Sequence, residues 1–120
     1  LNEYIIEWAH QTGIEATLKV DGFIDLSLEI KQAIYRIMQE ALATVTKHSS
    51  ANSVDVTLHF GNNSVEFCLS DDGIGFDTQQ QYDGMGLDSM RERVESLKGD
   101  FSIQSEPEQG TKICLTIPIE

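Results

Sequence analysis

Basic side chains are scarce in this sequence. Its 120 residues hold 8 Lys and Arg against 20 Asp and Glu, which gives a formal net charge of -12 at pH 7. A surface of this charge repels the phosphate backbone of nucleic acids and the headgroups of anionic membranes. We therefore expect no nucleic acid among the partners, and any phosphate-binding site must be a local one.

Long apolar runs and metal-binding cysteine motifs are also missing. No stretch reaches the roughly 20 apolar residues of a membrane span, and no basic-then-apolar leader opens the chain. The two cysteines, Cys68 and Cys114, lie in strand-like segments without metal-ligand spacing. We expect both to be reduced thiols that pack between the apolar positions of their strands, which favours a cytosolic location.

The size of the chain fits one compact domain. With 120 residues and 40% hydrophobic content, it can bury one core and has little room for a second. The sequence opens at Leu1 in a helix-like pattern without an initiator methionine. We therefore expect residues 1–120 to be a single domain cut from a longer protein.

Apolar periodicity predicts alternating helices and strands, because a 3.6-residue period indicates a helix and a two-residue period a strand. The polar stretch 77–83 has no apolar period and is predicted to be a mobile loop. This order predicts an α+β fold in which about three helices pack on one face of a mixed, mostly antiparallel sheet. The expected helices are 2–12, a long one that begins at Ser27, and one that opens at 84–86 and ends at Gly99; the expected strands are 14–20, 54–60, 65–69, 101–105 and 112–119.

One predicted strand runs into two acids and two glycines. Val65, Phe67 and Leu69 alternate, so Asp71 should point to the same apolar face, whereas Asp72 should face solvent. An unpaired carboxylate on an apolar face costs several kcal/mol or becomes protonated. We interpret Asp71 as an acceptor whose hydrogen-bond donor could be a ligand.

Two further patterns could hold phosphate or metal. Glu40, Thr44, Lys47 and His48 share one face of the long helix, and 84–87 places two glycines at a helix start. Free backbone N–H groups at a helix start can bind phosphate, and glycines allow a close approach. Spacing alone also fits an ordinary solvated helix face and an ordinary glycine before a helix, so both readings stay open here.

Other well-known sites are excluded. No Gly-Lys-Ser or Gly-Lys-Thr phosphate loop occurs, and Ser89 stands where a dinucleotide-binding motif needs its third glycine. Asp71 and Asp72 point to opposite faces, so they cannot act as paired acids on one substrate. Glycines occupy the alternate positions where a calcium loop needs acids, and no serine lies in a Gly-x-Ser-x-Gly elbow.

Taken together, several stretches closely resemble the ATP-binding catalytic domain of bacterial sensor histidine kinases. The resemblance spans nearly the whole chain and is strongest to the branch that phosphorylates LuxR-type response regulators and carries a short ATP lid. It implies a Bergerat-type two-layer α/β sandwich, as in gyrase and mismatch-repair ATPases, with ATP between the helix layer and the lid. The matching stretches are 34–42, 47–48, 70–76, 84–94 and 109–111.

The resemblance also implies roles on the adenine side of the pocket. Asp71 resembles the acid that accepts a hydrogen bond from the exocyclic amine of adenine. Gly73 and Gly75 would let the backbone pass close to the base. Thr111 resembles the hydroxyl that supports adenine recognition through water.

On the phosphate side, the resemblance implies that Gly84, Gly86 and Leu87 meet the phosphates at the end of the lid and the start of the helix. Lys47 and His48 would add positive charge there.

The implied metal site is Mg²⁺ held by Glu40 and the residue four positions later. Glu40 resembles the acid that activates the attacking histidine or orients the metal. The family places an asparagine at the later position, and this chain has Thr44. A threonine hydroxyl can bind Mg²⁺, but it reaches less far from the helix.

The implied function is transfer of the γ-phosphoryl group of ATP to a histidine on an upstream dimerisation and phosphoacceptor domain, which then serves a LuxR-type response regulator. The isolated chain is expected to be a monomer that binds ATP or ADP and has little kinase activity, and the full-length protein a homodimer. This domain would face the cytosol whether or not its parent is anchored to a membrane. Two alternatives remain: a degenerate regulatory nucleotide-binding module, because of Thr44, and a purely structural interaction domain.

Overall fold

The computed structural model describes residues 2–22, 25–48, 52–73, 87–105 and 110–119. Its elements follow the predicted order, and the loop predicted at 77–83 lies outside the described residues. The helices are α1 (Asn2–Thr12), α2 (Leu28–His48) and α3 (Leu87–Ser96); the strands are β1 (Glu15–Asp21), β2 (Ser53–Phe60), β3 (Ser64–Asp71), β4 (Asp100–Ser105) and β5 (Thr111–Pro118).

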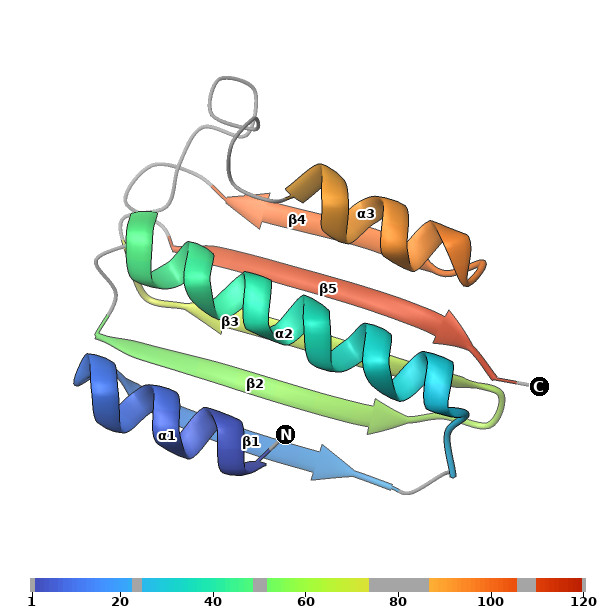
Figure 1. Cartoon of the computed structure of the whole chain (residues 1–120), viewed down its shortest axis with the longest axis horizontal. Helices are drawn as coiled ribbons and strands as arrows, with labels where there is room; N and C mark the ends of the chain where they lie inside the picture. Colours follow the sequence, from blue (N-terminus) through green and yellow to red (C-terminus); the bar gives the residue numbers. More distant parts are fainter. Residues whose placement is uncertain (1, 23–24, 49–51, 74–86, 106–109, 120) are drawn as a thin grey trace.

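The strands form one five-stranded sheet in the order β1-β2-β3-β5-β4. β1 pairs with β2 in parallel, and the other neighbouring pairs are antiparallel. Figure 1 shows the three helices lying over one face of this sheet. The prediction of a two-layer α+β fold with a mixed, mostly antiparallel sheet is confirmed. None of the described helices is long and apolar enough to cross a lipid bilayer.

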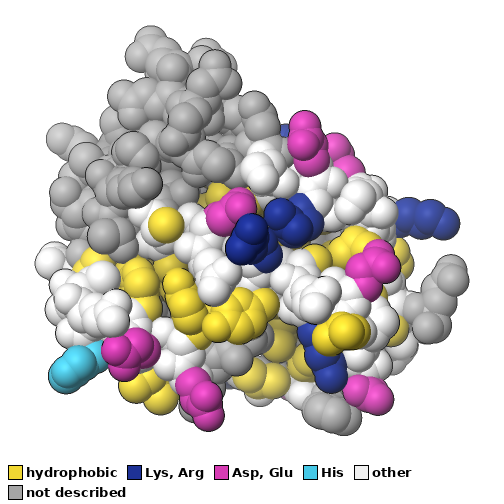
Figure 2. Space-filling model, in the orientation of Figure 1, with side chains coloured by type: hydrophobic (Ala, Val, Ile, Leu, Met, Phe, Trp, Pro, Cys, Tyr) yellow, Lys and Arg dark blue, Asp and Glu magenta, His cyan; other side chains and the backbone are white. Residues whose placement is uncertain are grey.

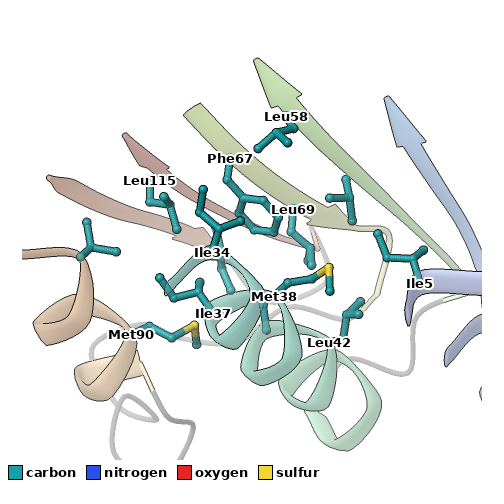
Figure 3. Packing of buried hydrophobic residues seen from close by; sticks show 14 of the residues in the cluster. Ile5, Ile34, Ile37, Met38, Leu42, Leu58, Phe67, Leu69, Met90 and Leu115 are labelled. Carbon is teal, nitrogen blue, oxygen red and sulfur yellow. The ribbon is translucent and has the colours of Figure 1, made fainter. Parts of the chain in front are cut away.

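The long helix α2 packs the helix layer against the sheet. It begins where predicted, because the Ser27 hydroxyl accepts a hydrogen bond from the N–H of Ile30 at 3.3 Å and so caps the first turn. Its buried stripe includes Ile37 and Met38, and Figure 3 shows these side chains directed toward Phe67 and Leu69 of β3. This packing holds α2 across the strand that ends in Asp71.

The end of α3 differs from the prediction. The helix stops at Ser96, and Lys98, rather than a glycine, takes the left-handed conformation with φ 63°. The N–H of Gly99 bonds to the carbonyl of Val94, and the N–H of Lys98 bonds to that of Glu95, which is a Schellman end. Gly99 is needed for another reason, because a side chain there would collide with the backbone oxygen of Thr116.

The expectation of reduced cysteines was wrong. Cys68 of β3 and Cys114 of β5 are directly opposite in the antiparallel register, their Cα atoms are 4.2 Å apart, and they form a disulfide. They alternate with the buried residues that face the helices, so the bond lies on the opposite face of the sheet. The sequence shows that each cysteine falls between apolar positions, but it does not show that the two strands are neighbours in this register.

This disulfide predicts a measurable contribution to stability. It joins residues 46 positions apart, and closing a loop of that length stabilises the fold by about 2–4 kcal/mol. We expect no thiol to react with Ellman's reagent in the unfolded, unreduced chain, and we expect dithiothreitol to lower the unfolding midpoint. The double variant Cys68→Ser/Cys114→Ser is the control, because dithiothreitol should not change its unfolding midpoint. Two reactive thiols in the unreduced chain would restore the original expectation.

Candidate functional site

The acid Asp71 closes an apolar strand, as predicted. Val65, Phe67 and Leu69 are at most 1% exposed, and Asp71, the next residue on that face, is half-buried at the end of β3. The strand therefore delivers a carboxylate to the boundary between the sheet and the helix layer.

The sheet brings three of the predicted site residues together. Thr111, the first residue of β5, lies directly opposite Asp71 in the β3–β5 register and is 7% exposed. The N–H of Gly73 donates a hydrogen bond of 2.8 Å to Oδ1 of Asp71, which turns the chain back immediately after the strand. Residues separated by forty positions in the sequence thus share one corner of the molecule.

The environment of Asp71 disfavours its charge. Burial raises the pKa of this carboxyl above its ordinary value of 3.8, and the neighbouring charge of Asp72 adds to the rise. Backbone hydrogen bonds from Gly73 and Thr111 act in the opposite direction without cancelling the effect of burial. A further donor, such as an amine of a ligand, would stabilise the ionised carboxylate here.

A close backbone approach at Gly110 supports this corner. Gly110 has φ +81°, and a side chain at this position would run into the carbonyl oxygen of Asp71, with Cα of Asp72 at 3.6 Å. Only glycine meets both requirements without strain. Sequence reasoning placed Gly110 in a matching motif but gave it no role, because this contact depends on how β5 enters the sheet.

The second acid, Asp72, is exposed as predicted, and it also anchors the chain. Its Oδ1 accepts hydrogen bonds from the backbone N–H groups of Asn52 at 2.8 Å and Ser53 at 3.0 Å, and its Oδ2 accepts one from the Ser53 hydroxyl at 3.0 Å. The hydrogen bonds from Ser53 and Asn52 lower the pKa of the Asp72 carboxyl. Asp72 therefore ties the start of β2 to the end of β3.

Those predicted phosphate and metal residues whose backbone the structure describes lie at the same end of the molecule. Figure 1 shows the C-terminal end of α2, the end of β3, the start of β5 and the start of α3 gathered there. Glu40 is half-buried on α2, with Oε2 shielded from solvent. Thr44, Lys47 and His48 belong to the last turns of α2, and their side chains lie outside what the structure describes.

The remaining predicted residues stay predictions. Gly75, Gly84 and Gly86 lie outside the described residues, and Leu87 is the first residue of α3, without a described side chain. The described part of the chain contains no group of three or more His, Cys, Asp or Glu side chains that could hold a metal ion by themselves.

Sequence comparison gives a consistent family. Residues 29–120 match the model of the histidine kinase-, DNA gyrase B- and HSP90-like ATPases. The chain is 35% identical over 121 residues to the signal transduction histidine-protein kinase/phosphatase DegS of Brevibacillus brevis, covering 99% of this chain and 31% of DegS. It is 35% identical over 95 residues to the sensor histidine kinase LiaS of Bacillus subtilis, covering 78% of this chain and 26% of LiaS. The chain thus spans about a third or less of these relatives.

Solved structures show the same fold at lower identity. The histidine kinase domain of a blue-light activated histidine kinase from Erythrobacter litoralis superposes with a TM-score of 0.77 at 19% identity, covering 98% of this chain and 58% of that one. The mycobacterial sensor histidine kinase MprB gives a TM-score of 0.72 at 18% identity, covering 98% of this chain and 90% of that one. The family match over residues 29–120, together with the relatives at 35% identity, shows that the chain belongs to the histidine kinase-, DNA gyrase B- and HSP90-like ATPases, and that it is an ATP-binding catalytic domain of the bacterial histidine kinase type.

Proposed function

We propose that this domain binds ATP with Asp71 as the adenine reader and that its parent protein transfers the γ-phosphoryl group to a histidine on a separate dimerisation domain. The observation that carries the proposal is the half-buried Asp71 carboxylate, held by Gly73 opposite Thr111. Its backbone donors leave acceptor capacity, because an ionised carboxylate offers about four lone-pair sites. The exocyclic amine of adenine is a donor of the required kind.

In this proposal the phosphates of ATP are bound by residues around the last turns of α2 and the start of α3. Glu40 is an oxygen ligand of the type that Mg²⁺ prefers, and Mg²⁺ usually takes one or two carboxylates together with phosphate oxygens and water. When bound, Mg²⁺ would supply positive charge that offsets the negative charge of the phosphates. Thr44 would add a hydroxyl ligand, and Lys47 and His48 would add positive charge.

Catalysis in this proposal is mainly positioning. Asp71 and Thr111 fix the base, and Glu40 activates the attacking histidine or orients the metal. An upstream phosphoacceptor domain supplies that histidine. ATP and ADP are the direct ligands, and a LuxR-type response regulator is served indirectly. The isolated chain is then a monomer with little kinase activity, the full-length protein is a homodimer, and the domain faces the cytosol.

The degenerate alternative depends on Thr44 alone. The relatives at 35% identity bear the names of histidine kinases, which favours an active enzyme over a degenerate module. A purely structural domain is also disfavoured, because a structural role gives no reason to keep the Asp71 carboxylate where burial raises its pKa.

The first prediction concerns nucleotide affinity. Asp71→Asn should weaken ATP binding by about 10- to 100-fold, because it removes a charge-assisted hydrogen bond of about 1.5–3 kcal/mol. Isothermal titration calorimetry measures the change. The matched control is Asp72→Asn, which alters the neighbouring exposed acid and should leave affinity within about twofold. An unchanged affinity in Asp71→Asn would remove the adenine-reading role.

The second prediction concerns pH and stability without nucleotide. Because the folded pKa of Asp71 is raised above 3.8, its stabilising contribution is present below that pH and is lost as pH rises through the folded pKa. Asp71→Asn mimics the protonated acid. Urea unfolding should therefore show similar stability at about pH 3, below the unfolded-state pKa, and a more stable variant at neutral pH.

Asp72 provides the control of opposite sign in the same measurement. Its folded pKa is lowered, so its contribution is present above 3.8 and is lost as pH falls. Asp72→Asn should consequently be less stable than the wild type at neutral pH and should approach it in acid. A difference between wild type and Asp71→Asn that does not vary with pH would contradict the assignment.

The third prediction concerns the metal. If Glu40 and Thr44 hold Mg²⁺, ATP should bind several-fold more tightly with Mg²⁺ than with a chelator, and Thr44→Asn should keep or strengthen that difference. Thr46→Asn is the matched control, because it lies two residues on and so on another face of α2. Equal affinity with and without Mg²⁺, together with transfer gained only by Thr44→Asn in the full-length protein, would instead establish the degenerate alternative.

A further inference from the structure

A groove of about 540 Å³ runs between α2 and α3 on the outer side of the helix layer. Figure 2, which views this side of the molecule, shows dark blue Lys and Arg side chains beside a yellow hydrophobic region near its centre. Among the residues that the structure describes, none assigned to the nucleotide site lines the groove. Its lining residues are Leu28, Lys31, Gln32, Tyr35, Arg36, Gln39 and Arg93.

The groove concentrates positive charge in an acidic protein. The chain has 8 Lys and Arg in all, and three of them, Lys31, Arg36 and Arg93, line this one groove. No acid is among the lining residues that the structure describes, although the chain has 20. The side chains of Gln32 and Gln39 add amide donors. The charged side chains that line the groove are therefore opposite in sign to the net charge of -12.

Two of these three cations form no ion pair within the described part of the chain. Neither Arg36 nor Arg93 forms an ion pair with a described residue, and Lys31 reaches only the exposed Asp25, at 3.8 Å. The Nε atom of Arg93 is buried and has no hydrogen-bond partner. A buried donor without an acceptor is costly, and neighbouring like charges repel each other. An anion in the groove would relieve both.

The shape of the groove fits a helix better than a small molecule. Sites for small ligands enclose most of the ligand, whereas this groove is open along α2 from Leu28 to Gln39, about 17 Å or three turns. Leu28, at 69% exposure, and Tyr35, at 39%, form an apolar row seven residues apart beside the cations. An apolar row of this kind next to charges is typical of helix-in-groove recognition.

We propose that this groove docks an amphipathic helix of a partner protein, and that Arg36 and Arg93 bind carboxylates which flank the apolar row of that helix. Leu28 and Tyr35 contact the apolar row itself. The proposal is independent of the nucleotide site and can be tested without ATP.

The test uses two synthetic helical peptides of about 16 residues, long enough to span the groove. One carries two leucines seven residues apart with flanking glutamates, and the other has glutamine in place of every glutamate. Fluorescence anisotropy of the labelled peptides should show that the glutamate peptide binds at least about tenfold more tightly, with binding weakened by salt. Equal binding of the two peptides, or binding of neither, would overturn the proposal.

Variants locate the binding on the groove. Arg36 is exposed, so Arg36→Gln should fold normally and should weaken binding of the glutamate peptide by about tenfold, and Arg93→Gln should do the same. Lys19→Gln removes the same charge from the exposed edge strand β1 and should have no effect. The double variant Arg36→Glu/Arg93→Glu should bind a lysine version of the peptide instead. Circular dichroism checks that each variant is folded.

Other occupants give distinct results. Sedimentation velocity that detects self-association of the chain, abolished by Arg36→Gln, would assign the groove to a second copy and overturn the partner-protein proposal. Inorganic pyrophosphate that binds as tightly as the glutamate peptide, and displaces it, would also overturn the proposal in favour of a small anion.

Discussion

The half-buried carboxylate of Asp71 is the constraint around which the fold is arranged. An apolar strand must end in an ionisable group on the side of the sheet that packs against helices, where desolvation opposes its charge. The structure manages this by placing the acid at the last position of β3. One step earlier on that face, at Leu69, the side chain is 1% exposed and a carboxylate would lie within the core.

The residues around Asp71 hold its carboxylate at this half-buried position. Gly73 and Thr111 supply backbone hydrogen bonds, so the carboxylate is held in one orientation but is not saturated. Gly110 lets β5 enter the sheet in contact with the Asp71 backbone, and Asp72 fastens the same turn to Ser53. Part of the acid's burial cost is thus left uncompensated by the protein, which is the expected state of a site that a ligand completes.

The sequence predicted the elements well because the signals for them are local. Alternation in β2 and β3 and the stripe of α2 follow from burial on one face, and Ser27 caps a helix through a contact three residues away. Apart from the local end of α3 at Lys98, the misses depend on long-range register. The Cys68–Cys114 bond needs β3 beside β5, and no local pattern reports that pairing.

The candidate site could also be predicted only as far as local signals reach. The alternation of apolar and polar residues predicts that Asp71 lies at the end of an apolar face, whereas its pairing with Thr111 depends on the order of the strands in the sheet. The anchoring role of Asp72 and the close approach of Gly110 were missed for the same reason, since their partners lie far away along the chain. Physical reasoning from the residues alone predicts an acid, Asp71, without a hydrogen-bond donor on an apolar face. The resemblance to a known family is needed to propose adenine as that donor.

The scarcity of positive charge finally makes its placement informative. In a chain with 8 basic residues, three of them, Lys31, Arg36 and Arg93, line the outer groove. One continuous helix, α2, carries both Glu40 and Arg36, which lie one turn apart. If a partner in the groove shifts α2 relative to β3, it changes nucleotide affinity, and ATP must then change affinity for that partner by the same factor. In that case α2 would connect the proposed docking groove with the proposed nucleotide site.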